Sequence, residues 1–192
     1  IYMYPYEGAN ASSSLKMNKT GETLIQMNNT SYVTISDMEL TSGVGKAIRM
    51  SNGKGNVIDT CYINGFMNNA IDMLTGYDNT VKNSHIEYCG TGAVTMSGGD
   101  KVTLTPGNNR VENCEINDFA LIKTIYSPGV SVDGVGNYVS HNELYNAEHY
   151  AVYFAGVENM IEYNNIHHAC TNAADMGAIY TGRHFDDHGV VI

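Results

Sequence analysis

The stretch Asn56-Val57-Ile58-Asp59-Thr60-Cys61-Tyr62-Ile63 contains the pattern that decides the fold of this chain. An Asn is followed by an aliphatic residue two positions later, a small or amide residue five positions later, and a second aliphatic residue seven positions later. Further copies, 22 to 30 residues apart, begin at Asn79, Asn109, Asn137 and Asn159, and a looser copy stands at Ser31-Tyr32-Val33. Constant columns with variable spacing indicate a repeat whose turns accept insertions.

A second strand follows in each copy, and its apolar residues alternate. Ala70-Ile71-Asp72-Met73 is one example. Period two marks a strand with one face in the core, and the spacing that a helical repeat would need is missing. Stacked copies would place one outward column on this strand: Arg49, Asp72, Thr95, Ser131, Tyr153 and Tyr180. A parallel column of Ala and Gly, from Ala47 to Ala178, would leave floor space beside it for a ligand.

These patterns predict an all-β protein, a right-handed, single-stranded parallel β-helix of about six rungs that is incomplete at its ends. We expect residues 31–192 to form regular rungs and residues 1–30 a less regular first rung, with 1–192 being part of a longer chain. The repeated Asn residues would form amide ladders between rungs, which is a structural role.

The charge of the chain limits the kinds of partner that it can bind. The 20 acidic and 10 basic residues give a net charge of −10, which disfavours nucleic acid and, unless cations bridge it, a polyanionic glycan. No apolar run is long enough to insert into a membrane, and we expect a monomer.

Stacking would hold Cys61, Cys89, Cys114 and Cys170 too far apart for disulfides, so all four should be free and buried. Free cysteines in an exported protein favour a reducing or anaerobic habitat.

Long insertions border the outward column, at 97–107, 117–129, 169–177 and 183–189. Loops on a rigid scaffold often carry function. We therefore predict a glycan-binding groove here, in which Tyr153 and Tyr180 stack on sugar rings and Asp72 also contacts the ligand. The alternative is an ordinary solvated sheet face.

Glycoside cleavage needs two carboxyl groups. Asp133 and Asp175 are predicted to stand two rungs apart, which makes them the first candidates, with Asp186 and Asp187 as competitors. The alternative is that each Asp caps a turn. The run His184-Phe185-Asp186-Asp187-His188 also has metal-ligand chemistry, but its loop position fixes no geometry, and we expect no metal and no cofactor.

Three segments resemble bacterial β-helix glycoside hydrolases of the pectin-lyase-like fold. They are His141 to Val152, Asn159 to His167 and, most specifically, Asp175-Met176-Gly177-Ala178-Ile179-Tyr180-Thr181-Gly182-Arg183. The chain is most similar to glycoside hydrolase family 141, which contains α-L-fucosidases and xylanases. This resemblance implies catalytic aspartates, with Asp175 as the best match. It also implies a secreted or periplasmic bacterial enzyme, often from an anaerobe. His184 stands where relatives often carry Asp.

The leading functional prediction is hydrolysis of a plant-type polysaccharide or its side chains by paired aspartates from Asp175, Asp133 and Asp186. His149, Arg183 and His184 would contact sugar hydroxyls. One alternative is a polysaccharide lyase that uses calcium and a basic residue from Arg49, Lys101, Lys123 or Arg183, although no tight acidic cluster is expected to face them. The other alternative is a non-catalytic, glycan-binding solenoid.

Overall fold

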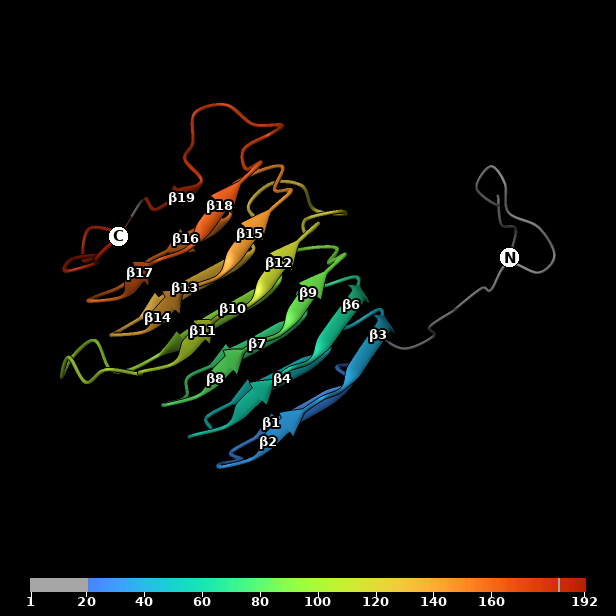
Figure 1. The fold of residues 1–192 in the computed structure, drawn as a ribbon. Coiled ribbons are helices and arrows are strands. Elements are labelled where there is room, and N and C mark those ends of the chain that lie inside the picture. Colours follow the sequence, from blue (N-terminus) through green and yellow to red (C-terminus); the bar gives the residue numbers. More distant parts are fainter. Residues whose placement is uncertain (1–20, 183) are drawn as a thin grey trace.

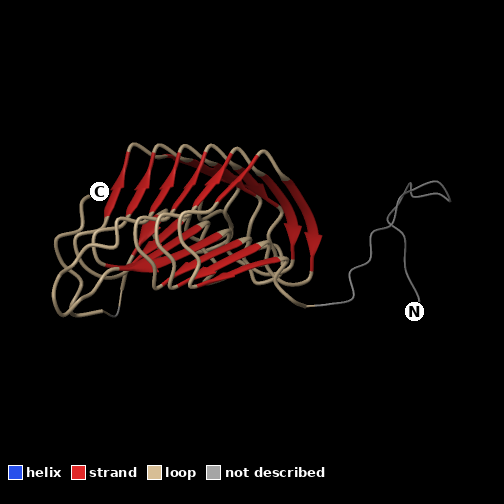
Figure 2. Cartoon of the chain, turned by 90° about the horizontal axis from the view of Figure 1, so that it is seen from below, coloured by secondary structure: helices blue, strands red, loops and turns tan. Residues whose placement is uncertain are grey.

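The computed structural model describes residues 21–182 and 184–192, and within them the chain coils into three parallel sheets. Each turn of the coil contributes one strand to each sheet, so the rungs stack side by side along one axis (Figures 1 and 2). Sheet 1 consists of β1 (Ile25–Asn28), β4 (Ile48–Ser51), β7 (Ile71–Leu74), β10 (Val94–Gly98), β13 (Val130–Gly134), β16 (Val152–Phe154) and β19 (Ile179–Tyr180).

The other two sheets contain six strands each. Sheet 2 consists of β2 (Thr34–Ser36), β5 (Val57–Asp59), β8 (Thr80–Lys82), β11 (Arg110–Glu112), β14 (Tyr138–Ser140) and β17 (Met160–Glu162). Sheet 3 consists of β3 (Glu39–Gly43), β6 (Tyr62–Phe66), β9 (His85–Glu87), β12 (Glu115–Asn117), β15 (Glu143–Tyr145) and β18 (Asn165–His167). The predicted parallel β-helix of about six rungs is confirmed.

The strand register also follows the sequence columns. Arg49 pairs with Asp72, which pairs with Thr95, and the column continues through Ser131 and Tyr153 to Tyr180. The predicted outward column of sheet 1 is therefore present and runs along the axis of the coil. Its rungs stand about 4.8 Å apart, so neighbouring side chains in the column are close enough to share one ligand.

The core is a stack of identical apolar positions. Ile48, Ile71 and Met73 are almost completely buried, and the aliphatic columns of sheets 2 and 3 fill the remaining space. At the turn into sheet 2, Asn79 Nδ2 donates to Asn109 Oδ1 (3.0 Å), and Asn109 Nδ2 donates to Asn137 Oδ1 (3.0 Å). The predicted amide ladder is confirmed.

Three expectations need correction. Ala47, Ala70, Ala93 and Ala151 are fully buried, because the turn into sheet 1 directs these side chains into the core, so they form no groove floor. Cys170 is only half-buried, because it lies in the long loop after β18, although all four cysteines are free as predicted. The sequence patterns also did not identify sheet 3 as strands. Residues 1–20 of the expected first rung lie outside the described residues, and β1 lies at its end.

The described residues include no helix that is long and apolar enough to cross a bilayer.

Candidate functional site

Four tyrosines meet on the outer face of sheet 1 near the last rungs. Tyr126, Tyr150, Tyr153 and Tyr180 line a cavity of about 180 Å³ together with Gly182, and we call it the tyrosine hollow. Tyr153 and Tyr180 come from β16 and β19, while Tyr126 and Tyr150 come from the loops that enter β13 and β16. The strand register thus supplies one wall of the hollow, and the two loops supply the other.

The aromatic rings of the hollow pack against one another. Tyr150 and Tyr180 are parallel, with an interplanar angle of 3° and centroids 5.5 Å apart, and Tyr153 is tilted against Tyr150 at 5.7 Å. Burial raises the pKa of Tyr150 to about 12, and the neighbouring tyrosines add to this effect. Its phenol is therefore protonated at neutral pH. Aromatic faces beside hydroxyl groups suit a sugar ring, which has apolar C–H faces and polar edges.

His149 adjoins this hollow from within the protein. Its side chain is only 4% exposed and contacts the rings of Tyr126 and Tyr150 at centroid distances of 5.3 and 4.2 Å. Burial lowers the pKa of His149, which favours the neutral ring. Its Nδ1 atom is buried and has no hydrogen-bond partner among residues 21–182 and 184–192. A buried polar atom without a partner is costly.

Carboxylates gather at the edge of sheet 1 where its strands end. Lys101 Nζ lies 3.0 Å from Asp133 Oδ1 and 3.9 Å from Asp186 Oδ2. Asp133 Oδ1 and Asp186 Oδ2 are therefore at most about 7 Å apart. Glycoside hydrolysis uses carboxyl groups about 5–5.5 Å apart for retention and about 6.5–9.5 Å apart for inversion, and this limit is compatible with either. Both side chains are half-exposed, so substrate can reach them. We call Asp133, Asp186, Asp187 and Lys101 the carboxylate edge.

Opposing effects act on Lys101. Burial lowers its pKa, whereas its hydrogen bond with Asp133 and the charges of Asp133, Asp186 and Asp187 raise it, and the net direction is upward. The ammonium therefore stays charged. Its loop is held by Asp100, whose Oδ1 accepts the backbone N–H of Val102 (2.8 Å). Lys101 thus provides a fixed positive charge between two carboxylates.

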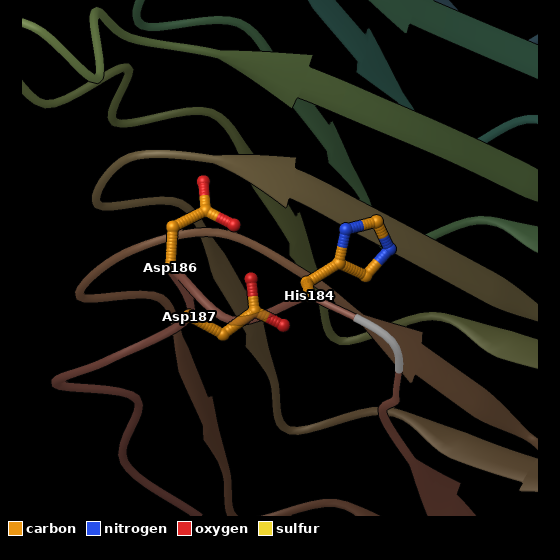
Figure 3. Close-up of side chains that lie close together, drawn as sticks. All are labelled: His184, Asp186 and Asp187. Atoms are coloured by element: carbon orange, nitrogen blue, oxygen red, sulfur yellow. The ribbon is translucent and has the colours of Figure 1, made fainter.

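The loop after β19 carries His184, Asp186 and Asp187, whose side chains lie close together (Figure 3). Asp187 anchors it, because its Oδ1 accepts the Gly156 N–H (2.5 Å) and its Oδ2 accepts the Thr181 hydroxyl (3.1 Å). His184 Nε2 lies 3.0 Å from the hydroxyl of Tyr153. Ligand atoms of His184, Asp186 and Asp187 lie within 4.8 Å of one another, so these three residues could together contact a cation.

The structure places the other predicted residues differently. Asp133 lies near the end of β13, whereas Asp175 is exposed and precedes the start of β19 by four residues, so in a parallel sheet they lie at opposite ends of the strands. Asp133 is therefore brought to Asp186 and not to Asp175. Asp72 is 5% exposed. Its carboxylate is engaged by Lys46 Nζ (2.9 Å) and Asn69 Nδ2 (2.8 Å). Arg183 lies outside the described residues.

Sequence reasoning did not select Tyr126 and Tyr150, and it considered Lys101 only as a possible base of a lyase. All three residues lie in loops that precede or follow strands of sheet 1. The expectation that no acidic cluster faces a basic residue was wrong, since Asp133 and Asp186 both contact Lys101. The only signal was that Lys101 and Tyr126 belong to long insertions, because loop contacts carry no periodic pattern.

Comparisons with known proteins agree with the observed coil. A family model described as "Right handed beta helix region" matches residues 23–182. The A-module of the Azotobacter vinelandii mannuronan C-5 epimerase AlgE4 is similar in structure, with a TM-score of 0.53 and 10% sequence identity, over 84% of this chain and 54% of that chain. The chain thus spans about half the length of this solved structure. At this identity the likeness concerns the fold. None of the curated proteins resembles the chain in sequence.

Proposed function

The chain belongs to the right-handed β-helix family, and from that premise we propose that it hydrolyses glycosidic bonds of a neutral, plant-type polysaccharide on the outer face of sheet 1. The observation that carries this proposal is that the tyrosine hollow and the carboxylate edge are neighbours. Tyr153 of the hollow forms a hydrogen bond with His184, and ligand atoms of His184 lie within 4.8 Å of those of Asp186 and Asp187 at the edge. A sugar ring stacked in the hollow would extend toward Asp133 and Asp186.

The proposed chemistry assigns one role to each carboxylate. One carboxylic acid protonates the glycosidic oxygen, and the second carboxylate activates water or attacks the anomeric carbon. Asp133 is the closer of the two to the Lys101 ammonium, which suits it to the charged role, and Asp186 would then act as the acid. His149, which contacts the rings of Tyr126 and Tyr150 from inside the protein, would hold these rings in position for the sugar.

A lyase is the second candidate, and one observation favours it. Lys101 and the three possible cation ligands His184, Asp186 and Asp187 lie at the same edge. A lysine together with a bound calcium could neutralise a uronate. However, the ammonium is already paired with carboxylates, and the net charge of −10 repels a polyuronate. Hydrolysis of a neutral polymer is therefore the better-supported proposal. The chain's likeness to a mannuronan epimerase supports only the general expectation of a polysaccharide partner.

Mass spectrometry of products from a panel of plant polysaccharides tests the reaction class. Products that gain one water per cut support a hydrolase. Products with an unsaturated end, formed only with calcium, would establish the lyase instead. Binding without any product would make the protein a recognition module.

Three matched substitutions test the residues. Asp133→Asn and Asp186→Asn should each lower kcat by about 10²- to 10⁴-fold, while the melting temperature stays close to that of the parent protein. Asp175→Asn should leave most of the activity, because Asp175 lies at the opposite end of the strands. If Asp175→Asn abolishes turnover and Asp186→Asn does not, the family resemblance identifies the acid correctly and our assignment of Asp186 fails.

A further inference from the structure

A second hollow lies at the corner between sheets 2 and 3, on the side of the coil away from sheet 1. Each rung passes through sheets 1, 2 and 3 in turn, so this is the one corner that sheet 1 does not touch. The hollow has a volume of about 460 Å³ and spans three successive rungs. Its lining includes Asn113, Glu115, His141, Glu143, Tyr163 and Asn165.

One turn position repeats along this corner, always with a left-handed backbone. In the earlier rungs it is occupied by Asp37, Thr60, Asn83 and Asn113, with φ between 50° and 56°. Asn113 Nδ2 donates to Asn83 Oδ1 (2.7 Å), so the amides of these two rungs are joined. Asn, Asp and His are the non-glycine residues found most often with this backbone conformation. The turn itself therefore favours a small polar side chain such as Asn.

The last two rungs depart from this arrangement. His141 (φ 57°) and Tyr163 (φ 55°) occupy the same position, and their rings stack with centroids 5.0 Å apart and an interplanar angle of 25°. Tyr163 remains 76% exposed. A left-handed backbone is unfavourable for a bulky aromatic residue, and a side chain this exposed recovers little energy through burial. The pair presents an aromatic face to solvent.

Polar groups border this face and are held in place by neighbours. Glu115 Oε1 accepts the hydroxyl of Tyr145 (2.6 Å), and Glu143 Oε1 accepts Asn165 Nδ2 (3.2 Å). Each carboxylate is thereby oriented through one oxygen, and the other oxygen can accept a hydrogen bond from a ligand. An aromatic platform with hydrogen-bond acceptors beside it matches the C–H faces and hydroxyl edges of sugars. The two carboxylates would repel an anionic chain.

We propose that this corner is a second glycan-binding site, which holds a neutral polysaccharide on the side of the coil away from the tyrosine hollow and the carboxylate edge. The choice of a polysaccharide as the ligand rests on the proposed function, whereas the stacking of His141 and Tyr163 is observed independently of that function. Two sites on opposite sides would let the protein remain attached to an insoluble polymer while sheet 1 acts on another segment. Such attachment raises the effective concentration of substrate at the groove.

Affinity electrophoresis in gels that contain soluble neutral arabinoxylan or xyloglucan tests this proposal. The experiment uses the full chain with Asp133→Asn, so that the polymer stays intact. Tyr163→Asn restores the residue type of the earlier rungs, so the fold should be unaffected. We expect the dissociation constant to rise about three- to tenfold, as for the loss of one aromatic contact. Tyr88→Asn is the matched control, since Tyr88 is also exposed (48%) and left-handed (φ 52°) but lies at another corner.

The outcomes separate this site from the proposed catalytic function. Weaker binding by Tyr163→Asn but not Tyr88→Asn supports the second site, even if no polysaccharide is ever cut. Equal binding by Tyr163→Asn and its parent overturns the site, even if hydrolysis is established. In a catalytically active background, Tyr163→Asn should leave kcat on short soluble oligosaccharides unchanged, and a loss there would also overturn the proposal.

Discussion

At the scale of single residues, His149 differs most from an ordinary histidine. Its ring lies under Tyr126 and Tyr150, its Nδ1 has no hydrogen-bond partner in the described part of the chain, and burial lowers its pKa from 6.5. The unfolded chain therefore binds more protons than the folded one in the interval between the two pKa values. Consequently the contribution of this histidine to the free energy of unfolding rises with pH across that interval. As the pH falls below about 6.5, protonation of His149 favours the unfolded chain and the protein loses stability.

His149→Asn should weaken the pH dependence of stability. Asn cannot be protonated, so the variant should lose less of its melting temperature than the parent between pH 7.5 and pH 5. Differential scanning fluorimetry in matched buffers measures this slope. Equal slopes in the two proteins would mean that burial of His149 does not oppose its protonation.

At the scale of elements, the amide ladder holds successive rungs at one turn. Asn109 is fully buried, and its Oδ1 accepts both the backbone N–H and the Nδ2 of Asn79 (3.0 Å each). Its own Nδ2 donates to Gly76 O (2.9 Å) and Asn137 Oδ1 (3.0 Å). Removing this side chain takes away the acceptor of the buried Asn79 backbone N–H and one hydrogen bond each from Asn79 Nδ2, Gly76 O and Asn137 Oδ1. The ladder therefore contributes to stability through rungs on both sides.

Asn109→Ala should lower the free energy of unfolding by about 2–4 kcal/mol, because several buried polar groups lose their hydrogen bonds together. Guanidinium denaturation followed by circular dichroism measures the change. Asn165→Ala is the control, since Asn165 is exposed and makes one side-chain hydrogen bond; it should change stability by less than about 0.5 kcal/mol. Similar losses from both variants would contradict a special role for the ladder.

At the scale of the whole molecule, charge selects the ligand class. The net charge is −10, and both proposed glycan sites contain carboxylates, Asp133 and Asp186 in one and Glu115 and Glu143 in the other. Over distances of several rungs these charges act together, and salt reduces their effect because the Debye length shortens from about 10 Å at 0.1 M to about 3 Å at 1 M. The protein as a whole should therefore favour neutral chains.

Binding to neutral and anionic polymers should respond oppositely to salt. The affinity for arabinoxylan should change little between low and high sodium chloride, whereas any affinity for polygalacturonate should increase as repulsion is screened. Isothermal titration calorimetry at several salt concentrations measures both. If polygalacturonate binds tightly at low salt and is released by salt, a positive surface recognises it, and the neutral-substrate proposal fails.

Much of the scaffold could be predicted from the residues alone. The Asn columns and the period-two strands predicted the parallel coil, the order of its rungs and the outward column from Arg49 to Tyr180. These features are local and repeated, so each copy supports the same interpretation. Sheet 3 was missed because its strands follow those of sheet 2 after only two residues, so the pattern of both strands reads as one segment.

The candidate site depends on contacts that no repeat encodes. Lys101 follows β10, Asp133 lies near the end of β13 and Asp186 follows β19, so three segments distant in the sequence meet at one edge. Which residues face outward could be predicted from the residues alone, because the alternation of a strand dictates it. The position of Asp133 beside Asp186 and not Asp175 depends on tertiary contacts, because irregular loops take their shape from individual hydrogen bonds and charges rather than from a period.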